Sequence, residues 1–271
     1  MSRLYNNPSY PAVDDPAEIA PALNDAHTRA VFYTDPRMPK TIRELAPAIT
    51  ASNNATLASA YQRISDDGTR EKSAGRVHYM DAVTMDQVQA EADSAGIQIA
   101  NDHNSLALLT RRINQMRNVF TQAYREYSGD TDSAIVTHLL FTPKGGIGRS
   151  PMLHVDNLPL TGHWSAALSS LEIMIEEPPA FLWEMLDKRK TNKLPKGANL
   201  PLQASLSAFV KHNPQDFERA ALGDLLILKG QKLRDLSNPL DRACVCVHTS
   251  DRHIAEEGQA AAMFYPKRQI K

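Results

Sequence analysis

Cysteine is scarce in this chain, and its scarcity is the first constraint on the chemistry. The only two cysteines, Cys244 and Cys246, are separated by one residue, which is too close for the geometry of an ordinary disulfide. A chain without disulfides fits a reducing compartment, so we expect a cytoplasmic protein. The sequence also lacks paired C-x-x-C motifs, H-E-x-x-H helices and G-x-S-x-G elbows, which disfavours several common metal and nucleophile chemistries.

Long apolar runs and an excess of charge of one sign are absent as well. The first ten residues, MSRLYNNPSY, have no apolar core of the kind that a signal peptide needs. No run approaches the roughly 20 apolar residues that cross a bilayer. The 30 basic and 31 acidic residues leave a formal net charge of -1, which gives no electrostatic footprint for nucleic acid. We therefore expect a soluble protein with neither a nucleic-acid nor a membrane partner.

The chain does contain enough apolar material for a proper core. Of its 271 residues, 42% are hydrophobic and 23% are charged, close to the average for globular proteins. This length suits one large domain or two small ones. We therefore look for a division within the chain.

The first part, residues 1–130, shows mainly helical spacing. Its strongest pattern is DHNSLALLTRRINQMRNVFTQAYREYSG, which ends at Gly129. Apolar residues recur there at steps of three and four, as expected for an amphipathic helix packed on a core: Leu106, Leu109, Ile113, Met116, Phe120 and Tyr124. A shorter helix is expected in TMDQVQAEADSAG, which begins at a threonine cap and ends at Gly96.

The second part, residues 131–271, reads as strands separated by turns. The expected strands lie in SAIVTHLLFTP, MLHVD, SAALSSLEIMIEE, GDLLILKG and RACVCVHT. Short helices are expected around PPAFLWEMLDKR and LSAFVKH. This order predicts an α+β protein, with a helical first half packed on a double-stranded β-helix, or jelly roll, as one integrated globular unit.

One short motif carries the candidate chemistry. PMLHVDN places His154 and Asp156 two residues apart, and alternate residues of a strand point to the same side. Non-haem iron sites use two histidines and one carboxylate on one face of the metal and leave the other positions open. The pair would supply two of three ligands. The alternative is a pair of ordinary polar residues at a strand end, before the turn at 157–159.

The sequence downstream of this motif strengthens the metal interpretation. GDLLILKG is a strand between turns, and QKLRDLSNPLDRACVCVH follows it. In order and rough spacing, the chain resembles the jelly-roll Fe(II)/2-oxoglutarate-dependent oxygenases. It resembles more closely an uncharacterised bacterial family, domain of unknown function 1826. Members of that family combine a central H-V-D, a later strand ending in K-G and an H-R-S-P-P loop, and this chain has PMLHVDN, LLILKG and DLSNPL at the corresponding places.

The resemblance leaves the third ligand open. Asp235 stands where the family has its loop histidine, and aspartate can bind iron or zinc. Alternatively His248 completes the site, because on a strand RACVCVH it would share one face with Arg242, Cys244 and Cys246. In a third interpretation the site is lost, and the chain is a binding or scaffold protein on an oxygenase-like fold.

The resemblance implies a non-haem Fe(II) dioxygenase that uses 2-oxoglutarate to oxidise a small molecule. His154 and Asp156 would be its catalytic metal ligands, with His248 or Asp235 as the third. The guanidinium fork of Arg242 would bind the 2-oxoglutarate carboxylate, unless it forms a salt bridge to Asp241 or Asp224. Two rival functions remain. One is a non-catalytic metal- or small-molecule-binding protein, with Zn(II) as the alternative metal, and the other is a structural protein without a metal.

Two further histidines and the thiols have expected roles outside the ligand set. His163 is expected on the surface or behind the ligands. His138, which alternates with Val136 and Leu140, is expected to be a satisfied core histidine. The thiols of Cys244 and Cys246 are expected to behave as small buried hydrophobes rather than as zinc ligands.

Overall fold

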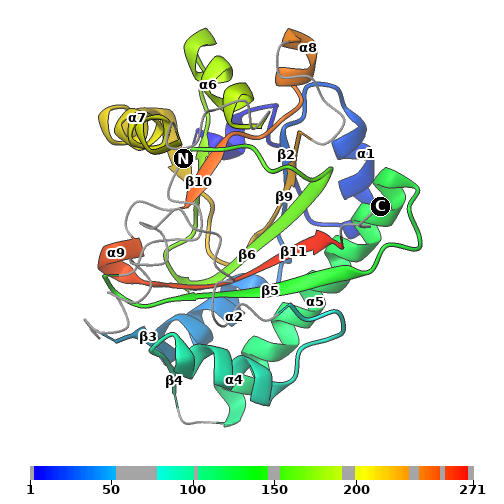
Figure 1. The fold of residues 1–271 in the computed structure, drawn as a ribbon. Coiled ribbons are helices and arrows are strands. Elements are labelled where there is room, and N and C mark those ends of the chain that lie inside the picture. The colour runs from blue at the N-terminus through cyan, green and yellow to red at the C-terminus, as the bar shows by residue number, and fades with distance from the viewer. Residues whose placement is uncertain are drawn as a thin grey trace.

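A six-stranded sheet forms the centre of the molecule (Figure 1). The computed structural model describes residues 3–52, 78–100, 103–145, 153–190, 199–231, 238–250 and 254–267. The strand order of the sheet is β1-β2-β9-β6-β11-β5, and every neighbouring pair is antiparallel except β1 with β2. The strands are β1 (Ala12–Val13), β2 (Ala30–Tyr33), β5 (Ile135–Thr142), β6 (Leu160–Leu168), β9 (Leu225–Lys229) and β11 (Gln259–Pro266).

A smaller sheet carries the remaining strands of the second part. Its order is β10-β7-β8, with β7 (Leu171–Met174), β8 (Phe217–Arg219) and β10 (His248–Ser250). An isolated antiparallel bridge joins His154 to His248, so the segment around His154 extends this sheet beyond β10. A separate pair of strands, β3 (Ile49–Ala51) and β4 (Ile97–Ile99), lies at the bottom of Figure 1 with α4.

The long helix α5 (His103–Ser128) covers one face of the six-stranded sheet. Its predicted apolar positions Leu109, Ile113, Met116 and Phe120 are all buried in the main core. We call the covered side the α5 face of the sheet and the opposite side the inner face. The helices α1 (Ile19–Asn24), α2 (Met38–Leu45) and α4 (Met85–Ser94) also contact α5, and 3-10 turns lie at Leu4–Asn6, Pro16–Glu18, Ala46–Ala48 and Pro214–Asp216.

Local signals account for the ends of these helices. The Thr84 hydroxyl accepts a hydrogen bond from the Gln87 N–H, while the Gln87 side chain accepts one from the Thr84 N–H. This capping box satisfies two amide groups that the helix cannot satisfy itself, so α4 begins at the predicted threonine. Gly129 follows α5 with a φ of 68°, a conformation that glycine adopts without a steric penalty.

The remaining described helices follow β7 in the chain. They are α6 (Ala180–Lys190), α7 (Asn199–His212), α8 (Pro239–Arg242) and α9 (Ile254–Glu257). Buried side chains of α6 and α7, including Trp183 and Leu206, pack with Leu153, Val155 and Val247 in a second apolar cluster. The residues that alternate with Leu153, Val155 and Val247 therefore point away from this cluster, towards the inner face of the large sheet.

The structure confirms the α+β class and corrects one detail. The first part of the chain also contributes β2, which pairs with β9 inside the main sheet. The predicted single strand RACVCVHT is wrong over its first half, where α8 and a turn precede β10. The reason is a helix start that we missed: Asn238 accepts a hydrogen bond from the Leu240 N–H, and Pro239 occupies the first helical position.

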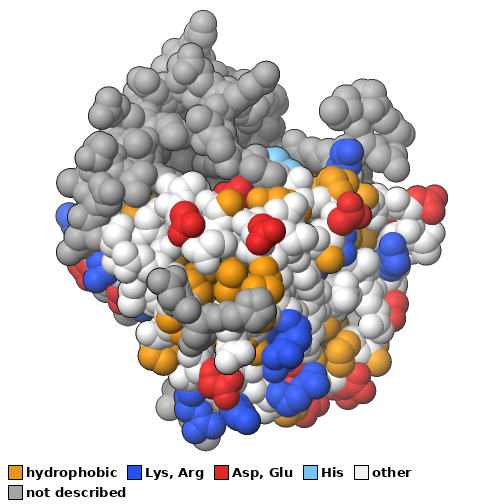
Figure 2. Space-filling model, turned by 90° about the horizontal axis from the view of Figure 1, so that it is seen from below, with side chains coloured by type: hydrophobic (Ala, Val, Ile, Leu, Met, Phe, Trp, Pro, Cys, Tyr) orange, Lys and Arg blue, Asp and Glu red, His pale blue; other side chains and the backbone are white. Residues whose placement is uncertain are grey.

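The surface agrees with the balanced composition. On the face shown in Figure 2, acidic and basic side chains are interspersed among hydrophobic ones. Within the described ranges, none of the helices combines the length and apolar character needed to cross a bilayer.

Candidate metal centre

The small sheet brings His154 and His248 directly opposite one another. The His154 N–H donates to the His248 carbonyl at 2.9 Å, and the His248 N–H donates to the His154 carbonyl at 3.0 Å. Residues that exchange hydrogen bonds in this way across an antiparallel pair project their side chains to the same side. Asp156, two residues after His154, shares that side. Backbone geometry alone therefore directs three potential ligands to one place.

The three side chains meet at distances that suit a single metal ion. His154 Nε2 lies 3.6 Å from Asp156 Oδ1, and His248 Nε2 lies 3.5 Å from Asp156 Oδ2. One ligand atom from each residue lies within 4.8 Å of the other two. Ligand atoms about 2.0–2.2 Å from a common metal lie about 2.8–3.6 Å apart in tetrahedral or octahedral geometry. The two histidine–carboxylate distances lie within this range.

Two of the atoms that face this centre are buried polar atoms. Among the described residues, neither Asp156 Oδ2 nor His248 Nε2 has a hydrogen-bond partner. Buried polar atoms are rarely left in this state, so each one calls for an explanation. The other ring nitrogen of His248, Nδ1, lies 3.2 Å from the Cys246 carbonyl. With the proton on Nδ1, that contact is a hydrogen bond, and Nε2 presents its lone pair to the centre.

The electrostatics of the site favour an ionised carboxylate. Burial disfavours the charged form of Asp156, but His248, His154 and His163, together with the Thr161 hydroxyl, outweigh it and hold the pKa of Asp156 below its usual value. A metal ligand must be deprotonated to bind. The imidazoles lower this pKa through positive charge, and a bound metal ion would supply that charge in their place once they ligate as neutral groups. The donor set of two imidazoles and one carboxylate fits Fe(II) and also fits Zn(II).

A glycine at the end of β9 fixes the backbone of the ligand loop. The Gly230 N–H donates to the Pro159 carbonyl at 3.1 Å, and the Gln231 N–H donates to the Asp156 carbonyl at 2.8 Å. The Cys246 N–H donates to the Lys229 carbonyl at 3.0 Å, so the same strand end also holds the segment that carries His248. The LKG end of the predicted strand therefore supports both ligand segments at once.

The predicted ligand residues can now be placed. His154, Asp156 and His248 come together, whereas Asp235 lies outside the described residues. Arg242 does not lie on a strand beside His248. It is on α8, and its guanidinium carbon lies 5.8 Å from the centre of the Trp183 ring. Its role as a carboxylate anchor stays a prediction.

The two cysteines differ in their surroundings. Cys246 is completely buried beside Tyr10 and Leu228, and burial raises the pKa of its thiol. The Cys244 thiol is half-buried and lies beside the Ala26 and Leu240 carbonyls. Both thiols are free, and the candidate ligand set contains neither of them.

Two residues of β6 complete the surroundings of the ligands. The His163 ring lies 6.0 Å from the His248 ring, next to the candidate ligand group but not part of it. Thr161, two residues earlier on the same face of the strand, approaches the Asp156 carboxyl. We missed Thr161 in the sequence, although its alternation with His163 directly after the H-V-D motif was a usable signal.

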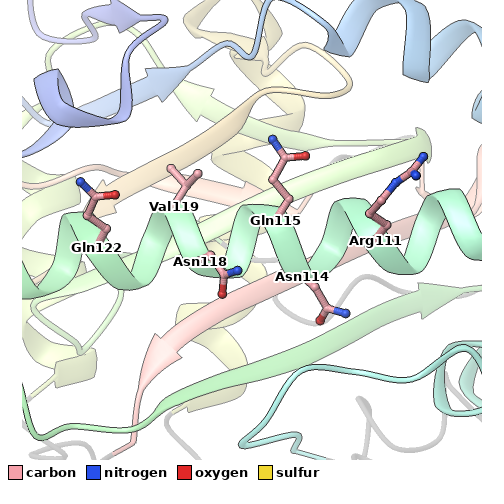
Figure 3. A pocket seen from close by; sticks show the side chains of 6 residues that line it. All are labelled: Arg111, Asn114, Gln115, Asn118, Val119 and Gln122. Carbon is pink, nitrogen blue, oxygen red and sulfur yellow. The ribbon is translucent and has the colours of Figure 1, made fainter.

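A separate hollow lies on α5, on the other side of the large sheet (Figure 3). It is lined by Arg111, Asn114, Gln115, Asn118, Val119 and Gln122. Two of these side chains stabilise the fold. The Asn114 amide accepts a hydrogen bond from the Val83 N–H and donates one to the Val83 carbonyl, and the Gln115 amide donates one to the Asp35 carboxylate. None of the six belongs to the metal centre, and the hollow offers no comparable group of converging ligands.

Comparison with known proteins gives only distant likenesses. A dioxygenase for auxin oxidation from rice aligns with a TM-score of 0.44 and 13% identity over 96% of this chain and 84% of that chain. Dioxygenase for auxin oxidation 1 from Arabidopsis thaliana, in a binary complex with 2-oxoglutarate, aligns with the same score and identity over 97% and 93%. The Fe(II)/α-ketoglutarate-dependent dioxygenase TqaL aligns with a TM-score of 0.34 and 13% identity over 94% and 88%.

No family model and no curated protein sequence matches the chain. The resemblance to domain of unknown function 1826 therefore depends on the three short motifs alone. The solved structures are similar to this chain, but at these scores neither their fold nor their activity is transferred to it.

Proposed function

We propose that this chain is a non-haem Fe(II)-dependent oxygenase of the 2-oxoglutarate type that oxidises a small molecule. The observation that carries the proposal is the group of His154, Asp156 and His248, whose ligand atoms converge from one side. Three ligands on one face of Fe(II) leave the opposite positions for a co-substrate and oxygen, which a closed structural site does not.

The strand order supports the proposal independently. Eight extended segments follow one another from β5: β5, the segment around His154, β6, β7, β8, β9, β10 and β11. The first, eighth, third and sixth are neighbours in the large sheet, and the second, seventh, fourth and fifth are neighbours in the small one. This alternation between two antiparallel sheets supports the jelly roll expected from the sequence. In this strand order, the segment that carries the H-x-D motif lies next to β10, which carries the distant histidine.

The residues of the chain have distinct tasks in this proposal. Asp156 offsets the metal charge, while His154 and His248 ligate as neutral imidazoles. The hydrogen bonds from Gly230 and Gln231 fix the loop that carries Asp156. When bound, Fe(II) would supply oxygen activation coupled to decarboxylation of 2-oxoglutarate. The resemblance to the 2-oxoglutarate oxygenases assigns Arg242 as the anchor of that co-substrate.

A second function is favoured by one observation. Arg242 lies against Trp183, which belongs to the second apolar cluster together with Leu153, Val155 and Val247. These last three residues alternate with the candidate ligands along the chain, so the cluster and the ligands lie on opposite sides of the small sheet. If Arg242 does not anchor 2-oxoglutarate, the same site would serve a metal-binding protein without oxidation, with Zn(II) as an equally suitable ion. The two functions therefore differ in whether 2-oxoglutarate reaches the metal.

Metal binding is tested first, by measuring metal content of the full-length protein. We expect one ion per chain in wild type and near-zero content in His154→Ala and His248→Ala. His212→Ala is the matched control, because His212 is an exposed histidine on α7 that bonds its own helix at Ala208. Equal, near-zero content in all four proteins would remove the site altogether.

Co-substrate use is tested next. Fe(II) is added to the protein without air, followed by 2-oxoglutarate, and a weak visible charge-transfer band is expected as the co-substrate chelates the iron. Arg242→Gln should need a higher 2-oxoglutarate concentration for the same band. Tight zinc binding without any band would refute the oxygenase and favour the metal-binding protein.

A further inference from the structure

Thr161 of β6 is completely buried, and its side chain points to the metal centre rather than to the main core. Its two neighbours in the chain lie on the α5 face: Leu160 belongs to the main core, and a Cβ atom at Gly162 would meet the ring of Phe120. Because side chains alternate along a strand, Thr161 points to the inner face. From there it approaches the carboxyl group of Asp156.

Two buried polar atoms lie unpaired at this contact. Within the described part of the chain, neither Thr161 Oγ1 nor Asp156 Oδ2 makes a hydrogen bond. Burial without a partner is costly for a hydroxyl, and a carboxylate is the strongest acceptor that it can meet. The two groups are therefore adjacent but not aligned, and a small turn of the carboxylate would satisfy both.

The histidines do not supply the donor that Asp156 needs when all three residues bind a metal. Asp156 Oδ1 lies 3.6 Å from His154 Nε2, and Oδ2 lies 3.5 Å from His248 Nε2. Both distances exceed those of ordinary N–H···O hydrogen bonds. A neutral imidazole that ligates through the nitrogen facing Asp156 offers a lone pair there and no proton. The Thr161 hydroxyl, in contrast, remains able to donate.

We propose that Thr161 is a positioning residue of the metal centre: when the ion is bound, its hydroxyl donates to one oxygen of Asp156 and directs the other oxygen to the metal. This inference rests on the function proposed above and adds the group that orients its only carboxylate ligand. Loss of a hydrogen bond behind a metal ligand weakens metal binding about 10- to 100-fold.

The test compares metal affinity with the stability of the metal-free protein, using Zn(II) as the probe. Thr161→Val replaces the hydroxyl by a methyl group of similar size. Because the hydroxyl has no partner within the described residues, the chelator-treated variant should unfold at the same or a higher temperature than wild type. Its Zn(II) affinity in chelator competition should nevertheless fall about tenfold or more.

Thr161→Ser should give the opposite pattern. It keeps the hydroxyl and deletes a buried methyl group, so its thermal stability should fall while most of the Zn(II) affinity remains. A residue that only fills space would lose stability and affinity together in both variants. The two substitutions therefore separate positioning of Asp156 from packing.

The matched control is Thr137→Val. Thr137 of β5 is also completely buried, and its hydroxyl is also unpaired among the described residues. It alternates with Ile135 and Leu139 of the main core, so it lies on the α5 face, away from the ligands. The same chemical change there should leave Zn(II) affinity at the wild-type value.

The outcomes separate this inference from the function on which it rests. Wild-type affinity in Thr161→Val, an equal loss in Thr137→Val, or a Thr161→Ser variant that binds as weakly as Thr161→Val would overturn the role of Thr161. Absence of Zn(II) binding by wild type would overturn the metal centre itself. Zn(II) binding that depends on Thr161, without any response to 2-oxoglutarate, would refute the oxygenase and support the positioning role.

Discussion

Replacement of Gly230 by alanine is the most direct test of how the metal centre is built. A Cβ atom at Gly230 would lie 2.0 Å from the Leu158 carbonyl oxygen and 2.6 Å from the Asp156 carbonyl oxygen. Ordinary contact begins at 3.4 Å, so the loop that carries Asp156 must move by about 1.4 Å. These are backbone carbonyl groups, which cannot move aside as the end of a flexible side chain can.

The size of the effect follows from what that movement breaks. The hydrogen bonds from Gly230 to Pro159 and from Gln231 to Asp156 would be lost or strained, at about 1 kcal/mol each. Asp156 would also move relative to His154 and His248 by a large part of a metal–ligand bond length. Loss of support behind a ligand typically weakens metal binding about 10- to 100-fold. We expect a loss in this range for Gly230→Ala.

The assay is competition for Zn(II) or Fe(II) against a chelator of known affinity, with thermal unfolding measured alongside. Gly129→Ala is the matched control, since a Cβ there meets nothing within 4 Å and only the positive φ is unfavourable. That variant should lose some stability, about 1 kcal/mol, but bind metal as wild type does. Wild-type metal affinity in Gly230→Ala would refute the claim that this strand end positions Asp156.

Three further outcomes are expected. Burial opposes ionisation of Asp35, but hydrogen bonds from Arg37 and Gln115 hold the pKa of its carboxyl at about 2, against 3.8 ordinarily. The ionised Asp35 therefore stabilises the fold at neutral pH, and this contribution is lost as the pH falls from about 4 to 2. Asp35→Asn should lower the free energy of unfolding at pH 7 by roughly 1–3 kcal/mol and flatten this acid dependence in urea titrations, whereas an unchanged acid limb would contradict the assignment. Gly162→Ala would place a Cβ 2.7 Å from Phe120 Cδ2, so chemical denaturation should show a loss of about 1–3 kcal/mol with unchanged metal content. Finally, a thiol reagent should modify at most one cysteine of the native protein and both after denaturation, and reaction of two native thiols would show that Cys246 is not buried.

Local signals predicted several elements because they act over a few residues. The apolar spacing of α5, its end at Gly129 and the threonine cap of α4 depend on neighbours within about one helical turn. The strand RACVCVHT was wrong at its start for a local reason too. Cysteine and valine alternate there as they would in a strand, and that pattern led us to overlook the helix start at Asn238 and Pro239. Both signals were present in the sequence, and we gave weight to the wrong one.

The third ligand illustrates what local reasoning cannot decide. His154 and Asp156 are paired by the period of a strand, so their common direction was readable directly. His248 was predicted as the third ligand with Asp235 as the alternative, because nothing in a single sequence fixes the register of β10 against a segment more than 90 residues earlier. That register is set by hydrogen bonds between His154 and His248, which exist only in the folded sheet.

The sequence by itself determined the α+β class, the long helix, the H-x-D pair and the strand that ends in Lys229 and Gly230. These depend on residue type and on periods of two or 3.6 residues, which the chain carries along its whole length. Only the tertiary structure decided that His248 joins the pair and that Gly230 supports the loop of Asp156. Each of these contacts unites segments distant in the chain, and its geometry follows from strand pairing, which is a property of the whole sheet.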